Sequence, residues 1–129
     1  MPLLTRVAGD TSVLVPFFVQ DVTKTTGIGL AGLVYNTAGL IASYRRNTAA
    51  SRTAITLVTM TLPTWASGGF VEDNATLAKG QYVLGVPNAA FVAGADYVEI
   101  RLEGAANMAP VPIVIELAPG IAAAVVVRG

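Results

Sequence analysis

The side chains that most often carry enzymatic or metal chemistry are scarce in this sequence. Its 129 residues contain no histidine and no cysteine. This composition excludes a Ser-His-Asp triad, a Cys-His dyad, a thiolate nucleophile and a structural zinc site of the usual kind. Without cysteine there is also no disulfide framework. The chemistry that remains is that of carboxylates, hydroxyls and arginines.

One group of oxygen-bearing side chains has a spacing that bears on metal binding or hydrolysis. Glu72, Asp73 and Asn74 are consecutive, and Asp96 is the next acid along the chain. Such oxygens suit Ca²⁺, and a carboxylate pair is the minimum for glycoside hydrolysis. Adjacent acids point apart on a strand or loop, and Asp and Asn are common turn formers. We therefore expect no catalytic residue, no metal and no cofactor.

A glycine motif, Gly27-Ile28-Gly29-Leu30-Ala31-Gly32, matches G-x-G-x-x-G. A dinucleotide site would require a strand before the motif, a helix after it, and an acid about 20 residues later. No Asp or Glu occurs between Asp21 and Glu72, and no βαβ pattern surrounds the motif. The segment is therefore predicted to be a flexible Gly-rich loop.

The remaining candidates are residues that could contact another molecule. Eight basic and eight acidic residues give zero net charge, so nucleic acid is not an expected partner. The one basic cluster, Arg45, Arg46 and Arg52, is expected to lie in solvent or to contact an acidic patch on a neighbouring subunit. Trp65 and Phe70 are expected to be core or interface anchors.

The C-terminal run is the most apolar part of the chain. It contains the interface candidates Ile121, Val125 and Val127. This run is either the last strand of the domain or a tail that adds to the sheet edge of a neighbour. We divide the chain into an N-terminal arm (1–11), a β-sandwich domain (12–117) and this apolar tail or last strand (118–129).

Short strands are the elements that would position these residues. Hydrophobic residues make up 53% of the chain and charged residues 12%, about half the charged share of an ordinary domain. Period-two alternation between turn residues predicts the strands. They cover residues 12–20, 40–45, 53–62, 70–72, 81–86, 97–103 and 111–117. Pro16 and Pro112 suggest edge positions, and residues 87–93 predict one short helical turn.

About seven to eight short strands without a long helical period predict an all-β fold. The expected architecture is an antiparallel β-sandwich, Ig-like or jelly-roll-like, with a barrel as the alternative. The uncharged stretch from Thr25 to Tyr44 is long enough to span a bilayer, but four glycines and Asn36 make it a poor lipid-facing helix. The N-terminus lacks a signal-peptide pattern. We expect no membrane segment and synthesis in a cytoplasm.

From Pro16 to Leu117, about four fifths of the chain, the sequence resembles small β-sandwich virion proteins of tailed bacteriophages. It is similar to the N-terminal module of phage baseplate upper proteins, which attaches a fibre to the baseplate. The resemblance is carried by residues 17–21 (FFVQD), 25–33 (TTGIGLAGL), 68–72 (GGFVE), 80–84 (GQYVL), 94–98 (GADYV) and 104–111 (GAANMAPV).

The resemblance implies a non-enzymatic structural protein of the virion, made in the cytoplasm of the bacterial host. No fibre region follows the sandwich in this sequence, so we expect a stand-alone part, above all a capsid decoration (cement) protein. Its partners would be copies of itself and the major capsid protein, joined by edge-strand pairing, apolar contacts and the terminal segments.

Two alternatives remain open at this point. The first is a tail or baseplate component that anchors a fibre or binds a host glycan through loops at 45–52 and 72–79. The second is a hydrolase that uses only carboxylates, from Glu72, Asp73 and Asp96.

Overall fold

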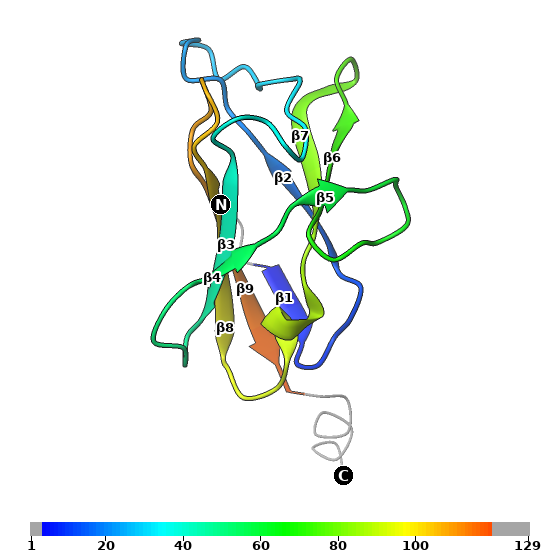
Figure 1. The fold of residues 1–129 in the computed structure, drawn as a ribbon, viewed down its shortest axis with the longest axis vertical. Coiled ribbons are helices and arrows are strands. Elements are labelled where there is room, and N and C mark those ends of the chain that lie inside the picture. Colours follow the sequence, from blue (N-terminus) through cyan, green and yellow to red (C-terminus); the bar gives the residue numbers. More distant parts are fainter. Residues whose placement is uncertain (1–3, 120–129) are drawn as a thin grey trace.

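Two β-sheets packed face to face form the domain, in a computed structural model that describes residues 4–119 (Figure 1). The larger sheet has the order β1 (Leu4–Val7), β9 (Val111–Ala118), β8 (Tyr97–Glu103), β3 (Ile41–Arg46), β4 (Thr53–Ile55). The smaller has the order β2 (Leu14–Phe18), β7 (Ala78–Gly85), β6 (Gly69–Asn74), β5 (Val58–Thr59). A 3-10 helix, η1 (Asn88–Phe91), connects β7 to β8 and confirms the predicted helical turn.

The predicted β-sandwich is confirmed, and the strand order is that of an immunoglobulin-type sandwich. Strand β2 pairs with β7 in one sheet, and β3 pairs with β8 in the other. This exchange of strands between two sheets is the Greek-key arrangement of immunoglobulin domains. The sheets are mixed and not purely antiparallel as predicted, because β1 runs parallel to β9 and β5 runs parallel to β6.

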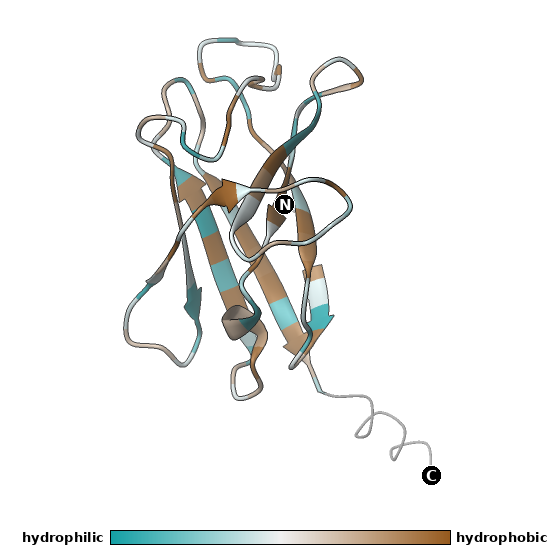
Figure 2. Cartoon of the chain, turned by 45° about the vertical axis from the view of Figure 1, so that its right-hand side comes forward, coloured by the Kyte–Doolittle hydropathy of each residue, from teal (hydrophilic) through white to brown (hydrophobic). Residues whose placement is uncertain are grey.

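Alternation along the strands separates the core from the outer faces. In β8 the inward side chains Val98, Ile100 and Leu102 are completely buried, whereas Tyr97 and Glu99 point outward. The corresponding hydrophobic and hydrophilic bands are visible along the strands in Figure 2. No helix among residues 4–119 has the length and apolar character needed to cross a membrane.

Three predicted segments differ from the structure. The predicted strand 53–62 divides into β4 and β5, which belong to different sheets. The described part of the predicted arm 1–11 contains β1, which pairs with β9 of the same chain. Of the predicted tail 118–129, Ala118 ends β9. The candidates Ile121, Val125 and Val127 lie outside the described residues.

Pro16 lies in the edge strand β2 as predicted, whereas Pro112 lies in the internal strand β9, in the part that β1 does not cover. The backbone N–H of Val19 donates to the carbonyl oxygen of Gly80, on the β7 side. The odd-numbered residues of β2 therefore bond to β7, and the backbone nitrogen of Pro16 faces the free side of the strand. In β9, the backbone N–H of Leu117 donates to the carbonyl oxygen of Asp96, on the β8 side. Odd-numbered residues of β9 therefore bond to β8, and the backbone nitrogen of Pro112 faces away from β8. Within the described residues, β1 pairs with β9 only from Ile115 onward. Because proline has no N–H, strand addition is weakened at Pro16 and at Pro112.

Two glycines, Gly29 and Gly39, let the β2–β3 connection (residues 19–40) contact its neighbours closely. A Cβ atom at Gly29 would lie 2.2 Å from the carbonyl oxygen of Lys79 in β7. A Cβ atom at Gly39 would lie 2.6 Å from the carbonyl oxygen of Gly104 in the β8–β9 turn. Neither position accepts a side chain without backbone movement. The Gly-rich segment is therefore held by packing and is not the flexible loop predicted from the sequence.

We predict that Gly29→Ala lowers the free energy of unfolding by about 2–4 kcal/mol, because the contacting atom is backbone and cannot move alone. Gly27→Ala is the matched control. Gly27 has a φ of 77° and no atom within 4 Å of an added Cβ, so its cost is about 1 kcal/mol of backbone strain. Chemical denaturation measures both losses. Equal losses would contradict the close-approach explanation.

Candidate interaction surfaces

The β2–β3 connection covers one end of the sandwich and is attached to the β8–β9 turn. Val22 donates a backbone hydrogen bond to Asn107 (2.9 Å), and Ala109 donates one to Gln20 (3.1 Å). Figure 1 shows these two loops side by side at the top of the molecule, near the β6–β7 hairpin. Connections of this length are uncommon in compact domains and often carry function.

Tyr82 fixes the middle of this connection from inside the core. Its hydroxyl donates to the carbonyl oxygen of Leu30 (2.6 Å) and accepts from the backbone N–H of Leu33 (3.1 Å). Its ring stacks on Phe17 and on Phe70, with centroid distances of 6.0 and 5.2 Å, and the three rings form one cluster in which Phe17 and Phe70 are also 6.0 Å apart. Burial raises the pKa of the Tyr82 hydroxyl, although the Leu33 hydrogen bond opposes the shift. The phenol therefore stays protonated and acts as a structural donor.

The carboxylates proposed for metal binding or hydrolysis are not brought together. Glu72 accepts a hydrogen bond from the backbone N–H of Gly32 (3.3 Å) and so supports the β2–β3 connection. Asp96 lies at the other end of the sandwich, where the Asn47 side chain accepts from its backbone N–H (2.7 Å). Asn74 caps the β6–β7 turn through its side-chain oxygen. Among residues 4–119, no group of three metal-ligating side chains is close enough to hold an ion.

Exposed apolar side chains are frequent on the β2–β3 connection and on the β6–β7 hairpin. Nine large hydrophobic residues are exposed within the described chain. Four of them lie on the β2–β3 connection, and Leu77, 86% exposed, lies on the adjacent β6–β7 hairpin. We call Val22, Ile28 and Leu77 the loop-end surface, because Val34 and Tyr35 line hollows beside β4, β5 and β6 instead. Exposed apolar groups gathered on neighbouring loops are typical of an interaction site.

Two of the three predicted interface arginines act within the chain. The Arg46 guanidinium donates to the carbonyl oxygens of Ala89 (3.4 Å) and Ala93 (3.2 Å), and also to that of Val92. It thereby fastens η1 and the following turn to β3. The Arg52 side chain bonds to Ser43 and pairs with Glu99.

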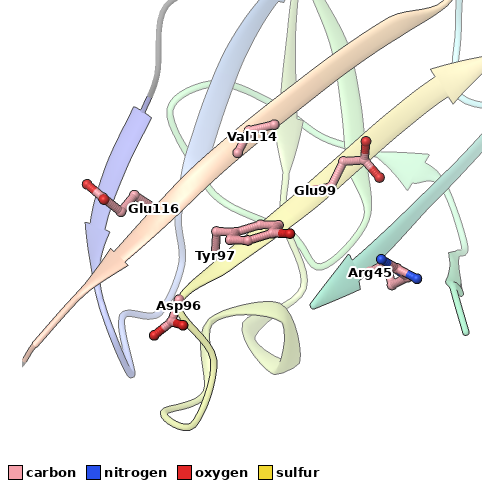
Figure 3. A pocket seen from close by; sticks show the side chains of 6 residues that line it. All are labelled: Arg45, Asp96, Tyr97, Glu99, Val114 and Glu116. Atoms are coloured by element: carbon pink, nitrogen blue, oxygen red, sulfur yellow. The ribbon is translucent and has the colours of Figure 1, made fainter. Parts of the chain in front are cut away.

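Arg45 instead lines a hollow of about 500 Å³ on the outer face of the large sheet. The other side chains that line it are Asp96, Tyr97, Glu99, Val114 and Glu116 (Figure 3). Arg45 lies on one side of Tyr97 and Glu116 lies on the other (Figure 3). The hollow is shallow and mixed in charge, which suits contact with another protein surface.

The two predicted aromatic anchors have different positions. Phe70 is 3% exposed and belongs to the core, which is the first of the two positions expected for it, and so it is not available as an interface residue. Trp65 is half-buried, and its indole N–H donates to the carbonyl oxygen of Val86 (3.2 Å). The aromatic side chain therefore attaches the β5–β6 loop to the end of β7. The loops at 45–52 and 72–79 lie at opposite ends of the domain (Figure 1), so they do not form one glycan site.

Sequence patterns did not identify the loop-end surface or the role of Tyr82. Val22 and Ile28 lie in a segment without periodicity, where sequence gives no indication of exposure. Leu77 carries one signal, because it follows the Asn-Ala-Thr turn of a hairpin. The exposure of Leu77 follows from that turn position.

We predict that Tyr82→Phe destabilises the domain by about 1–3 kcal/mol, because Leu30 and Leu33 each lose a buried hydrogen-bond partner. Hydrogen exchange at the Leu33 amide should accelerate more than exchange in β8. Tyr44→Phe, in the core of the other sheet, is the matched control, since no side-chain hydrogen bond of Tyr44 occurs among the described residues. Unchanged exchange at Leu33 would contradict the anchoring role.

No family model, curated protein or solved structure matches this chain.

Proposed function

We propose that this protein is a non-enzymatic structural component of a tailed-phage virion, and that it decorates the capsid as a cement protein. The observation that carries the proposal is the loop-end surface, an exposed apolar set on an ordered connection. Such a surface suits contact with a large, fixed partner. The sequence resemblance to small phage virion proteins supplies the class of that partner.

The positions of the charged side chains support a structural role. Glu72 and Asp96, two of the three acids considered for hydrolysis, lie at opposite ends of the sandwich and hydrogen-bond to loop segments. Arg46 and Arg52 hold loops in the same way. A hydrolase needs two acids across a cleft, and these residues are distributed differently.

Purified particles from cells that carry the gene provide the test. We expect the chain in the particles by mass spectrometry, and density for it on the capsid surface by electron cryomicroscopy. Density on the tail or baseplate would instead support the alternative component, and absence from the particles would refute a virion role.

A binding experiment tests which surface makes the contact. Particles that lack the protein should bind the Val22→Ser/Leu77→Ser variant about tenfold or more weakly than the unaltered chain, because two apolar contacts are lost. Val92→Ser is the matched control, since Val92 is also exposed but lies beside Arg46 at the C-terminal end of β3, away from the β2–β3 connection. Co-sedimentation measures both. Equal binding by the two variants would overturn the assignment of the loop end.

A further inference from the structure

The outer face of the large sheet carries nearly balanced charge. Its charged side chains are Arg45, Arg52, Arg101, Asp96, Glu99, Glu103 and Glu116. Ion pairs join Arg52 to Glu99 (2.7 Å) and Arg101 to Glu103 (2.6 Å). Within residues 4–119, Arg45, Asp96 and Glu116 take part in no ion pair. All three are exposed, so this face presents one cation and two anions that are available to a partner.

Arg45 and Glu116 flank Tyr97 (Figure 3). The strand register places Arg45 opposite Glu99 and places Glu116 opposite Tyr97. Arg45 and Glu116 are therefore about 10 Å apart across two strand spacings and about 7 Å apart along the strands. A partner that binds both side chains must place an anion over Arg45 and a cation over Glu116. The anion and the cation on the partner must therefore have the same separation as Arg45 and Glu116.

We propose that this face binds a second copy of the chain through a two-fold axis, with Arg45 of each copy paired to Glu116 of the other. A two-fold contact brings each residue pair together twice, so Arg45 and Glu116 of one copy can each pair with the opposite charge on the other copy. The inference rests on the proposed assembly function, because it names one subunit contact that such an assembly uses.

Three observations favour a second copy as the occupant. The charges on the face nearly cancel, so two copies do not repel strongly. Tyr97 is 43% exposed beside the two charges, and Tyr and Arg are the side chains most enriched in interface anchors. Pro16 removes one hydrogen-bond donor from the free side of the edge strand β2, which weakens strand pairing at that edge and favours contact through a sheet face.

The register also fixes how the two copies lie. A two-fold axis that exchanges Arg45 with Glu116 passes across β8 between Tyr97 and Glu99. The strands of the two copies then cross at roughly 70°, closer to the orthogonal class of sheet packing than to the aligned class. Tyr97 lies near its own symmetry mate. Glu99 also lies near the axis, but Arg52 balances its charge.

Charge reversal tests the contact in the purified chain. The unaltered protein should form dimers at about 100 µM, and the dimer should weaken as salt rises from about 50 to about 500 mM. Arg45→Glu and Glu116→Arg should each weaken dimerisation by about tenfold or more, because each creates two like-charge contacts. Sedimentation equilibrium measures association, and circular dichroism verifies the fold of each variant.

Mixing the two single variants gives the sharper test. A chain with Glu at both positions and a chain with Arg at both positions repel their own kind, but attract each other at both contacts. The mixture should therefore form a heterodimer of near-original affinity. The double variant Arg45→Glu/Glu116→Arg should form a homodimer of near-original affinity, because its two charges are exchanged. Lys79→Glu and Asp73→Arg, two exposed changes near the β6–β7 hairpin of the other sheet, are the matched controls and should leave dimerisation unchanged.

A monomeric unaltered chain at this concentration, or a mixture that stays monomeric, would overturn the inference. Neither result depends on phage particles. If dimers form as expected and the chain is absent from particles, the contact stands and the proposed virion function fails. If the chain decorates particles and the mixture stays monomeric, the function stands and this contact fails.

Discussion

The hydrogen bonds of Tyr82 connect the core of the sandwich to the loop that covers one end. The ring is completely buried in an aromatic stack of the smaller sheet, and the hydroxyl reaches Leu30 and Leu33. The stacked ring fixes where the hydroxyl lies, so the middle of the β2–β3 connection is fixed as well. Gly29 and Gly39 then allow the two halves of the connection to contact β7 and the β8–β9 turn. The loop-end surface depends on these three attachments.

The structure shows what the few charged side chains of this chain do. Charged residues make up 12% of the sequence, and several of them hold the chain's own loops. Glu72 supports Gly32, Arg46 fastens η1, and Arg52 ties the β3–β4 turn to the sheet face. Few charges remain to coat the surface with hydrated groups. Exposed apolar side chains therefore take up part of the surface, and several of them lie on the β2–β3 connection and the β6–β7 hairpin.

Local patterns in the sequence predicted the strands that are buried on one face. Residues 97–103 alternate strictly and form β8, and the predicted strand 111–117 extends by one residue in β9. Pro16 indicated an edge because a missing N–H is a local property. Residues 53–62 alternate equally well, yet the chain crosses from one sheet to the other at Thr56–Leu57. Alternation reports which side chains face inward, but it does not say to which sheet a strand belongs.

Contacts between distant segments could not be predicted in this way. The parallel pairing of β1 with β9 joins residues more than 100 positions apart, and no local pattern reports it. Gly29 resembled part of a nucleotide motif because its actual constraint, the Lys79 carbonyl, is 50 residues away. Phe70 was an interface candidate because a short strand of three predicted residues does not define its inner face. In β6 its side chain meets Tyr82 and is buried.

The two prolines and the two surfaces together restrict how copies of this chain can assemble. Because Pro16 removes a donor from the free side of β2 and Pro112 removes one from the part of β9 that β1 does not cover, strand pairing is weakened at these two places, and faces and loops are the surfaces proposed for assembly. The Arg45–Glu116 contact lies toward the start of β8, whereas the loop-end surface lies beyond the end of that strand. A dimer through the sheet face therefore leaves both loop ends outside the contact and directs them apart, by roughly 70° for the crossing derived from the register. Under the proposed function, two diverging loop ends on one dimer would bind two neighbouring positions on a particle surface, which is the contact that a cement protein makes.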